Sequence, residues 1–423
     1  MSLRLAWRLG LRVVLSPGSR TASRFLVSAS LAMALGLVPL VVVLSVADGM
    51  IDGISARTIE TSLYHVQAWS PGGLDPEGSR TMLETSLRSV PGFRGAWPEQ
   101  QGFALAYGAA GGNRLGVSVR GIDARWPRED PGASRFLKAE AGTLNLSGDQ
   151  AWIGRAAADK LGLQVGSELK LLTTRTKGSL TVPRVTTVRI AAIVSVGYQE
   201  LDRLWLFVPL DLSLQMFDTG EEPVFWGIKG DFPLQKTPEF LAGVRTALGP
   251  SWQAVSWETT GRSQFLNYQA TRALLAVVMV LILLVAAVNV STAMVTTVAE
   301  RRKETALLKA LGASDALVQQ QFLVLGFGGG LAGALVGVGL GMGLAIGIDP
   351  LVRGIDALVS LFTPGRGFHL LNAAFYLESI PVRFDPLVLA AAGAGSVLLA
   401  VVASWWPARR AARERPLEVL RRA

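Results

Sequence analysis

Four long stretches of the chain lack any ionisable side chain. They run from Phe25 to Ala47, Leu274 to Val298, Phe322 to Ile348 and Leu387 to Trp406. A hydrocarbon core about 30 Å thick requires about 20 helical residues, and a helix satisfies its own backbone hydrogen bonds in lipid. Buried helices of a soluble core are the alternative, but they rarely run this far without a charge. The pattern predicts four membrane-spanning helices.

The first stretch has a second interpretation, a cleaved signal peptide. Arg4, Arg8 and Arg12 precede it, and Ser45-Val46-Ala47 resembles a cleavage site. The apolar part of a signal peptide usually has about 7 to 15 residues, whereas this stretch has 23. We therefore expect an uncleaved helix. The preceding residues 2–14 gather the arginines on one helical face, which indicates either an interfacial helix or a solvated positive flank.

Basic residues beside the spans predict their orientation. Residues 1–24 hold five Arg and no acid, residues 299–318 hold four basic and three acidic residues, and residues 407–423 hold six Arg and two Glu. Positively charged flanks stay in the cytoplasm, so we expect these three segments inside. They account for the net charge of +9, which therefore does not indicate a nucleic-acid-binding surface.

This topology leaves residues 48–271 as one external insertion between the first and second spans. Its 224 residues are enough for a separate core. Strand-like runs at 168–174, 185–196 and 204–208 alternate with helical patterns, and one helix is expected to start at Thr237 and stop at Gly249. The predicted fold is an α-helical membrane protein with four transmembrane helices and a large mixed α/β domain inserted between the first and second helices.

The predicted segments follow from these boundaries. They are a cytoplasmic interfacial segment (1–24), the first helix (25–47), the external α/β domain (48–271), the second helix (272–298), a cytoplasmic helix (299–317), the third helix (318–348), an external loop (349–385), the fourth helix (386–406) and a cytoplasmic basic tail (407–423).

Glycine is frequent in the third span, where seven glycines create overlapping small-xxx-small spacings that let helices approach closely in lipid. They are Gly326, Gly330, Gly333, Gly337, Gly341, Gly343 and Gly347. We expect this span to pack tightly against another helix. In the second span Asn289 requires a polar partner, which could be another helix or, less simply, the substrate.

No catalytic constellation is found in the sequence. The chain has no phosphate-binding loop of the G-x-x-x-x-G-K-[ST] type, no cysteine, and only two histidines, which lack metal-ligand neighbours. Gly116 to Arg120 lacks the second glycine of a serine-nucleophile elbow. We expect neither catalysis nor a metal or cofactor on this chain.

The segment from Ala299 to Ser314 carries the most informative pattern. Leu307 and Leu311 share one helical face, Gly312 suits the position after a helix end, and Ser314 can cap the next helix. By pattern alone this is either a solvated loop helix whose charges set the topology or a short helix that enters a groove of a partner.

Glu300 to Ala313, read as E-R-R-K-E-x-A-x-L-K-A-L-G-A, resembles the signature of the FtsX-like permeases. Val42 to Met50 is similar to the V-L-S-V-x-N-G-F motif of the lipoprotein-releasing LolC/LolE type, from which it departs at Asp48 and Met50. Four further parts of the chain match the same type: Ile153 to Arg155 with Lys160 to Ser167, Ile380 to Val382, Pro407 to Ala412, and Pro416 to Arg421.

The resemblance implies two permease protomers, identical or homologous, and two ATPase subunits of the LolD type that bind ATP and Mg. In such permeases the cytoplasmic segment docks on the ATPase. The implied coupling residues are Glu300, Arg301, Arg302, Glu304, Leu307, Leu308, Lys309, Leu311 and Gly312.

The resemblance also implies extraction of lipoproteins from the bacterial inner membrane and transfer to a periplasmic carrier of the LolA type, with acyl chains and lipids between the first two helices. The implied cavity residues are Val38, Pro39, Val42, Val43, Val278, Ile282 and Asn289. Thr173 to Thr187 corresponds to a carrier-docking hook, with Arg175, Lys177 and Pro183, but it is shorter here and could be an ordinary hairpin.

Two other functions fit the same organisation. One is a signalling permease of the cell-division FtsX type, which regulates periplasmic enzymes. The other is an efflux permease of the MacB type. All three carry a large external insertion between the first and second spans, so the sequence leaves these alternatives open.

Overall fold

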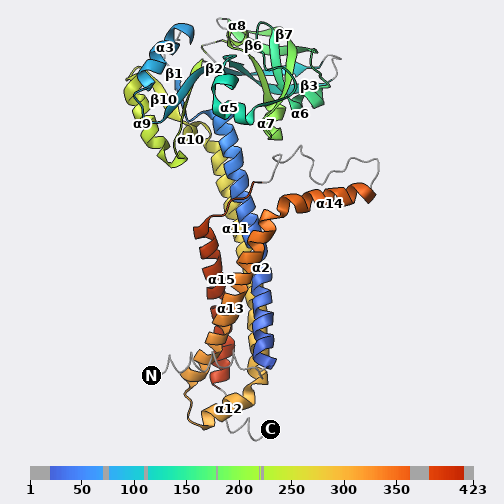
Figure 1. Cartoon of the computed structure of the whole chain (residues 1–423), viewed down its shortest axis with the longest axis vertical. Coiled ribbons are helices and arrows are strands. Elements are labelled where there is room, and N and C mark those ends of the chain that lie inside the picture. The colour runs from blue at the N-terminus through green and yellow to red at the C-terminus, as the bar shows by residue number, and fades with distance from the viewer. Residues whose placement is uncertain are drawn as a thin grey trace. The chain divides into compact units, whose positions relative to one another are not determined.

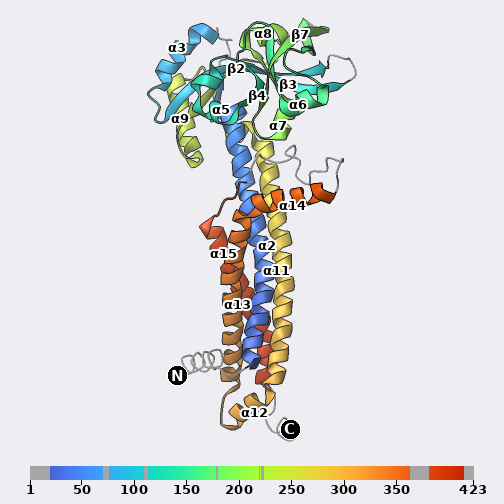
Figure 2. The same ribbon diagram turned by 45° about the vertical axis from the view of Figure 1, so that its right-hand side comes forward.

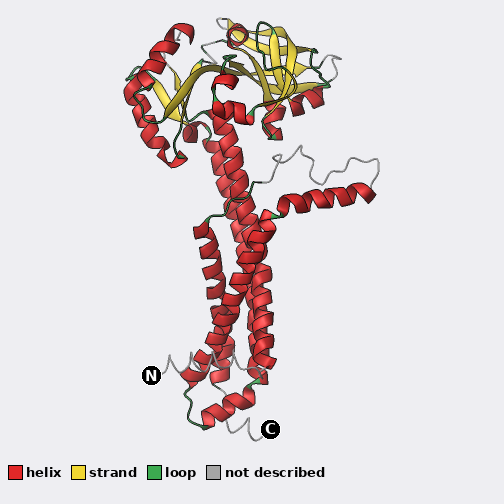
Figure 3. Cartoon of the chain, in the orientation of Figure 1, coloured by secondary structure: helices red, strands yellow, loops and turns green. Residues whose placement is uncertain are grey.

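The computed structural model describes residues 20–69, 76–108, 113–177, 180–218, 220, 223–362 and 381–413. The predicted N-terminal interfacial segment at residues 2–14 and the end of the basic tail lie outside these residues. The chain divides into two compact units. We call Met1–Met50, Tyr268–Arg353 and Pro381–Ala423 the helical unit, and Ile51–Asn267 with Gly354–Ile380 the sheet unit. The described strands all belong to the sheet unit (Figure 3).

The helical unit is built from four long helices that run beside one another (Figure 2). They are α2 (Arg20–Thr58), α11 (Arg262–Glu300), α13 (Asp315–Ile346) and α15 (Pro386–Ala412). Within the described part of the chain, these four are long and apolar enough to cross a membrane. The fold prediction is confirmed, since the mixed sheet lies in sequence between the first and second of these helices.

Glycines of α13 allow two neighbouring helices to approach it closely. A β-carbon at Gly333 would lie 2.7 Å from Met33 Cβ on α2, and one at Gly330 would lie 2.7 Å from Ala400 Cβ on α15. Gly337 and Gly341 face α2 in the same way. The predicted tight packing of this helix is therefore confirmed, and it involves two helices at once.

The sheet unit contains one mixed sheet. Its described strands are β1 (Val66–Trp69), β2 (Phe93–Tyr107), β3 (Arg114–Ile122), β4 (Lys138–Gly142), β5 (Gln150–Gly154), β6 (Glu168–Lys177), β7 (Leu180–Ser195), β8 (Trp205–Pro209), β9 (Phe225–Gly230) and β10 (Gln253–Ser256). The order is β10-β1-β9-β2-β3-β8-β5-β7-β4, and β6 pairs with both β2 and β7. The pairs β3–β8 and β5–β7 are parallel, and the others are antiparallel.

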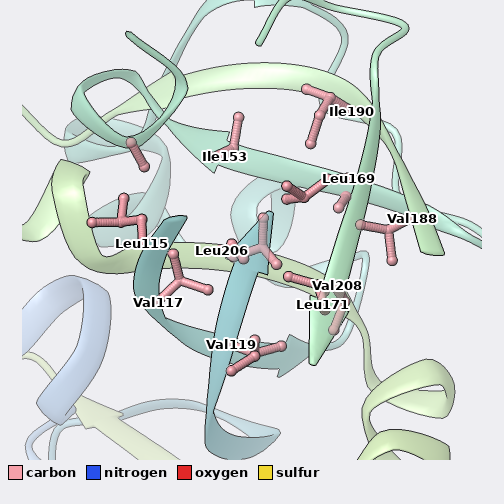
Figure 4. Close-up of a cluster of buried hydrophobic side chains, with 14 of the residues drawn as sticks. Leu115, Val117, Val119, Ile153, Leu169, Leu171, Val188, Ile190, Leu206 and Val208 are labelled. Carbon is pink, nitrogen blue, oxygen red and sulfur yellow. The ribbon is translucent and has the colours of Figure 1, made fainter. Parts of the chain in front are cut away.

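Six of these strands close on themselves, because β6 joins β7 back to β2 and completes the ring β2-β3-β8-β5-β7-β6. Alternate side chains of each strand point into the ring and form a core of small and branched residues (Figure 4). Val117, Ile153, Leu171 and Ile190 are among these buried residues. A closed ring leaves fewer exposed strand edges.

The part of the sheet from β10 to the first half of β2 is covered by α3 (Pro76–Leu87) and α9 (Thr237–Leu248) (Figure 1), and β4 pairs with β7 outside the ring. The predicted start of α9 at Thr237 and its stop at Gly249 are confirmed. The remaining described helices are η1 (Ile59–Leu63), α4 (Trp126–Glu129), α5 (Pro131–Phe136), α6 (Arg155–Leu161), α7 (Gln199–Leu204), α8 (Leu210–Met216), η2 (Leu234–Lys236), α10 (Trp257–Thr260), α12 (Arg302–Ala310) and α14 (Ile348–Phe362).

Candidate functional site

The predicted cytoplasmic helix is α12, which lies between the end of α11 and the start of α13 (Figure 1). Gly312 follows it with φ +97°, a left-handed conformation that glycine adopts without a steric penalty. The Ser314 hydroxyl then accepts a hydrogen bond from the Leu317 backbone N–H at 3.3 Å and caps α13. The predicted helix end and cap are therefore both confirmed.

Two basic residues of this segment are turned away from solvent, and one of them, Lys309, holds it against α13 and α15. Lys309 Nζ lies 2.8 Å from Asp315 Oδ1 and donates to the Ala412 carbonyl at the end of α15 at 2.7 Å. Arg301 is only 6% exposed and pairs with Glu304 at 3.4 Å. Because of these contacts, α12 is attached to both α13 and α15.

Two leucines are exposed on α12 and at the residue that follows its last turn. Leu307 is 58% exposed and Leu311 is 79% exposed. Leu308 is half-buried, while Glu300, Arg302, Glu304 and Gly312 are exposed. Two neighbouring apolar side chains on the exposed face of a short helix can insert into a hydrophobic groove of another protein. The structure thus separates the predicted coupling residues into an outward group and the inward pair Arg301 and Lys309.

The predicted cavity residues lie on α2 and α11, which approach closely where a β-carbon at Gly36 would be 2.9 Å from Ala286 Cβ. Val43 packs against the buried side chains between these helices. Val38, Pro39 and Val42 are half-buried, and α2 continues through Pro39. On α11 the exposed predicted residues are Val278, Ile282 and Asn289. The predicted residues thus comprise half-buried positions on α2 and exposed positions on α11, and their role stays a prediction.

An ion pair that the sequence analysis did not predict joins α2 to α11. Asp48 Oδ1 lies 2.8 Å from Arg272 Nε, and Asp48 Oδ2 lies 3.0 Å from Arg272 NH2. Beside it, Gly49 has no room for a side chain, since a β-carbon would be 2.1 Å from the Pro381 carbonyl oxygen. The departure from the family motif at Asp48 was a signal that this residue has a specific role. Its partner, Arg272, could not be predicted because it is 224 residues away in the sequence.

The predicted carrier-docking residues lie on the hairpin of β6 and β7, whose pairing extends from Glu168 with Arg189 to Lys177 with Leu180. Pro183 is exposed and lies opposite Thr174. The strand-turn-strand prediction is confirmed for the two strands, while the turn at 178–179 and the side chains of Arg175 and Lys177 lie outside the described residues.

A buried ion pair inside the sheet unit also escaped the sequence analysis. Arg120 on β3 donates two hydrogen bonds to Glu99 on β2, at 2.6 and 2.8 Å, and the Tyr64 hydroxyl donates to Glu99 at 2.5 Å. Burial, together with the neighbouring Glu99 carboxylate, raises the pKa of Tyr64 well above its ordinary value. Trp205 stacks against the Arg120 guanidinium at 4.7 Å. Through its hydrogen bond to Glu99, Tyr64 attaches the end of η1 to strand β2.

A second buried cluster lies next to it. Lys229 on β9 pairs with Asp130 and with Glu60, and Arg94 on β2 pairs with the same two carboxylates. Burial lowers the pKa of Lys229, although the charges of Asp130 and Glu60 act to raise it. A charge within an apolar strand, as in Gly227-Ile228-Lys229, was a usable signal. Its partners could not be predicted from their sequence positions.

Two protein families match the chain. FtsX-like permease C-terminal matches residues 276–416, and MacB-like periplasmic core domain matches residues 27–227. LolC of Neisseria meningitidis, a lipoprotein-releasing system transmembrane protein, is 27% identical over 98% of both chains. LolE of Haemophilus influenzae is 23% identical over 92% of both chains. LolC of Xylella fastidiosa is 23% identical over 99% of this chain and 98% of that one.

Among solved structures, the extracellular domain of the noncanonic ABC-type transporter YknZ from Gram-positive bacteria aligns with 45% of this chain and 99% of that domain. The identity is 11% and the TM-score is 0.29.

The two family matches cover complementary parts of the molecule. The first contains most of α11 and all of α12, α13 and α15, and the second contains most of α2 and of the sheet unit. Members of the FtsX-like family are non-catalytic transmembrane subunits, and membership implies an ATPase partner and no cofactor on this chain. The chain is thus a multi-pass membrane protein with an extracytoplasmic core domain. It belongs to the FtsX-like permeases, with a MacB-like periplasmic core domain.

Proposed function

We propose that this chain is the permease subunit of an ABC transporter that extracts lipoproteins from the bacterial inner membrane for transfer to a periplasmic carrier and the outer membrane. The observation that supports this most strongly is similarity to LolC and LolE along almost the whole length of both partners. Those relatives are named as parts of lipoprotein-releasing systems. A LolA-type carrier is the expected acceptor.

In this proposal a separate LolD-type ATPase binds ATP and Mg and supplies the energy. The exposed Leu307 and Leu311 are the contacts by which α12 would enter the ATPase. Lys309 ties α12 to Asp315 of α13 and Ala412 of α15. A displacement of α12 would therefore be passed to both helices. Arg301 and Lys309 support the coupling helix from inside the permease.

The substrate path is assigned to α2 and α11, the helices that flank the core domain in sequence. Exposed apolar residues on α11, such as Val278 and Ile282, suit acyl chains, and the half-buried Val38 and Val42 on α2 extend this apolar surface. The hairpin containing Pro183 is the candidate carrier contact.

The test is release of a labelled triacylated lipoprotein from membranes or proteoliposomes that contain the chain and its co-expressed ATPase. ATP-dependent transfer to a soluble carrier is expected. A stable ATPase complex that hydrolyses ATP without release would contradict lipoprotein extraction. Changed activity of periplasmic hydrolases would then favour signalling, and sensitivity to amphipathic drugs would favour efflux.

Replacement of Leu311 by Glu tests the coupling surface. A carboxylate in an apolar groove must be desolvated, so we expect at least a tenfold loss of ATPase co-purification and of ATP-dependent release. Leu204→Glu makes the same change at an exposed leucine of the sheet unit and should leave co-purification intact. Equal co-purification of the two variants would disprove the assignment of Leu311.

A further inference from the structure

Helix α14, which follows the third span after Gly347, carries its large apolar residues on one face (Figure 1). Residues three or four positions apart share a face of a helix. The residues at this spacing, which we call the α14 apolar face, are Ile348, Leu351, Val352, Ile355, Leu358, Val359 and Phe362. No polar residue interrupts this face. The pattern is that of a helix lying between apolar and polar surroundings.

The charged residues of α14 lie on the other side of the helix. Asp349 and Arg353 are one turn apart, and Arg353 NH2 lies 2.7 Å from Asp349 Oδ2. Asp356 follows Arg353 by three positions and falls on the same side by helical spacing. Two acids and one base leave this side slightly negative. Helix α14 therefore lacks the basic surface by which many interfacial helices are attracted to anionic lipids.

The first two turns of the α14 apolar face are open. Leu351 is 53% exposed and Ile355 is 45% exposed, while Ile348 and Val352 are half-buried. Contact of several adjacent apolar side chains with water is unfavourable. The face therefore requires a cover that the described part of the chain does not supply.

The level at which α14 starts follows from the register between α13 and α2. Glycines of α13 meet residues of α2 in equal steps along both helices, as Gly333 with Met33, Gly337 with Leu37 and Gly341 with Val41. Continued in the same steps, this register places Ile348 level with Asp48. The ion pair of Asp48 with Arg272 follows directly on the apolar stretch of α2. Because charged groups avoid the hydrocarbon, α14 starts where the apolar layer ends.

This end of α13 lies on the external side of the membrane. The core domain is extracytoplasmic, and α11, α12 and α13 follow it in that order. Helix α11 therefore crosses inwards and α13 crosses outwards. The apolar part of α13 from Phe322 to Ile346 rises about 36 Å, slightly more than the hydrocarbon core of about 30 Å. Helix α14 thus starts in the headgroup layer of the outer leaflet.

We infer that α14 lies in the outer surface of the membrane, with its apolar face inserted into the lipid and its charged side towards water. Such helices insert by about 5 to 10 Å, to the boundary between headgroups and acyl chains. The covalent connection to α13 keeps α14 at the surface, so attraction to anionic lipids is not required. The outer end of α13 is thereby held at one depth.

A soluble protein is the competing occupant of the α14 apolar face. Protein interfaces usually surround an apolar centre with polar groups that bond to the partner. On α14 the charged neighbours Asp349 and Arg353 already pair with each other. Hydrocarbon is present at the level of Ile348 at all times and needs no polar contact, so a lipid surface fits the face better.

Spin labels on single cysteines test the inference, because the chain contains no other cysteine. Leu351→Cys and Ile355→Cys place the label on the apolar face. Arg353→Cys, on the charged side of the same two turns, is the matched control. Each full-length variant, purified with its co-expressed ATPase, is reconstituted into phosphatidylcholine vesicles. Collision rates are then measured with oxygen, which concentrates in hydrocarbon, and with a water-soluble nickel chelate.

The ratio of oxygen to nickel accessibility should be about threefold or more higher at positions 351 and 355 than at position 353. Addition of phosphatidylglycerol should leave this difference unchanged. Equal ratios at the three positions would place α14 in water and overturn the inference. Labels at 351 and 355 that are shielded from both reagents would show a protein cover and would also overturn it. So would a difference that appears only with phosphatidylglycerol.

A second substitution tests whether apolar contact holds the helix. In the Ile355→Cys background, Leu351→Glu places a carboxylate on the inserted face and should lower the accessibility ratio about threefold, since the charge must be hydrated. Arg353→Gln, on the charged side, should leave the ratio unchanged. An unchanged ratio in the Leu351→Glu variant would contradict insertion. These measurements require no lipoprotein, so their outcome is independent of the proposed function.

Discussion

Individual buried charges attach η1 to the sheet, since Glu60 of η1 pairs with Arg94 of β2 and Lys229 of β9. Lys229 and Asp130 are both completely buried and pair with each other. Asp130 also caps α5, where it accepts from the backbone N–H groups of Gly132 and Ala133 at 3.3 and 3.0 Å. With Glu60 and Arg94 they form a cluster of two positive and two negative charges, so the loss of either one leaves one unbalanced charge in a buried setting, which is far more costly than the loss of an exposed pair.

Lys229→Met and Asp130→Asn should each reduce the free energy of unfolding of the sheet unit by about 3 to 5 kcal/mol. The double variant should lose less than the sum, because no unpaired charge remains. Chemical denaturation of the purified full chain, followed by tryptophan fluorescence, measures this. Arg125→Met, which breaks an exposed pair with Asp123, is the control and should cost less than about 1 kcal/mol.

His65 should make the sheet unit sensitive to mild acid. Burial, against the opposing charge of Glu60, lowers the pKa of His65 from 6.5 to about 4. Arg94 and Lys229 act in the same direction as burial, and Asp130 acts against it. Between these two pKa values the unfolded chain binds more protons than the folded one. Stability is therefore lost as pH falls from 6.5 towards 4.

The loss should approach about 1.4 kcal/mol per pH unit within that window. His65→Gln removes the titrating group, so its unfolding free energy should vary less between pH 6.5 and 4.5 than that of the parent chain. Titration of carboxylates at lower pH is common to both proteins. Parallel pH dependence in the two proteins across the window would show that His65 is not the cause.

At the scale of elements, the glycines of α13 decide how closely α2 can approach. A β-carbon at Gly333 would meet Met33 Cβ at 2.7 Å and the Ser30 carbonyl oxygen at 2.8 Å. At Gly339, six residues later on the same helix, no atom lies within 4 Å. The two positions have the same residue type but opposite surroundings.

Gly333→Ala should destabilise the helical unit by about 1 to 3 kcal/mol through overpacking. Gly339→Ala should be neutral or slightly stabilising, because alanine favours a helix more than glycine does. The thermal midpoint of each purified variant in detergent measures the difference. If both midpoints move in the same direction by the same amount, close packing at Gly333 is not the reason for the glycine.

Helix α12 shows what local sequence can and cannot specify. Gly312 and Ser314 predicted its end and the following cap, because a helix end and an N-cap involve residues within a few positions of one another. The same sequence did not reveal which of its charges point inward. Lys309 turns inward because Ala412, 103 residues away, supplies an acceptor.

For the whole molecule, the sequence by itself determined the four spanning helices, the α/β insertion and the family. Runs of apolar residues indicate whether lipid or water surrounds each segment. The motif from Glu300 to Ala313 is contiguous, so it can be recognised in the sequence. These features depend on neighbours in the chain, so they are readable without coordinates.

Only the tertiary structure decided which distant residues meet. The closure of the ring by β6, the pairing of Asp48 with Arg272 and the burial of Lys229 beside Asp130 all join segments far apart in sequence. The exposure of Asn289 also depends on which side of α11 the other helices cover. Such contacts depend on how elements that are distant in the sequence pack together. Hydrophobic periodicity identifies the apolar face of an element but does not identify the element that covers it.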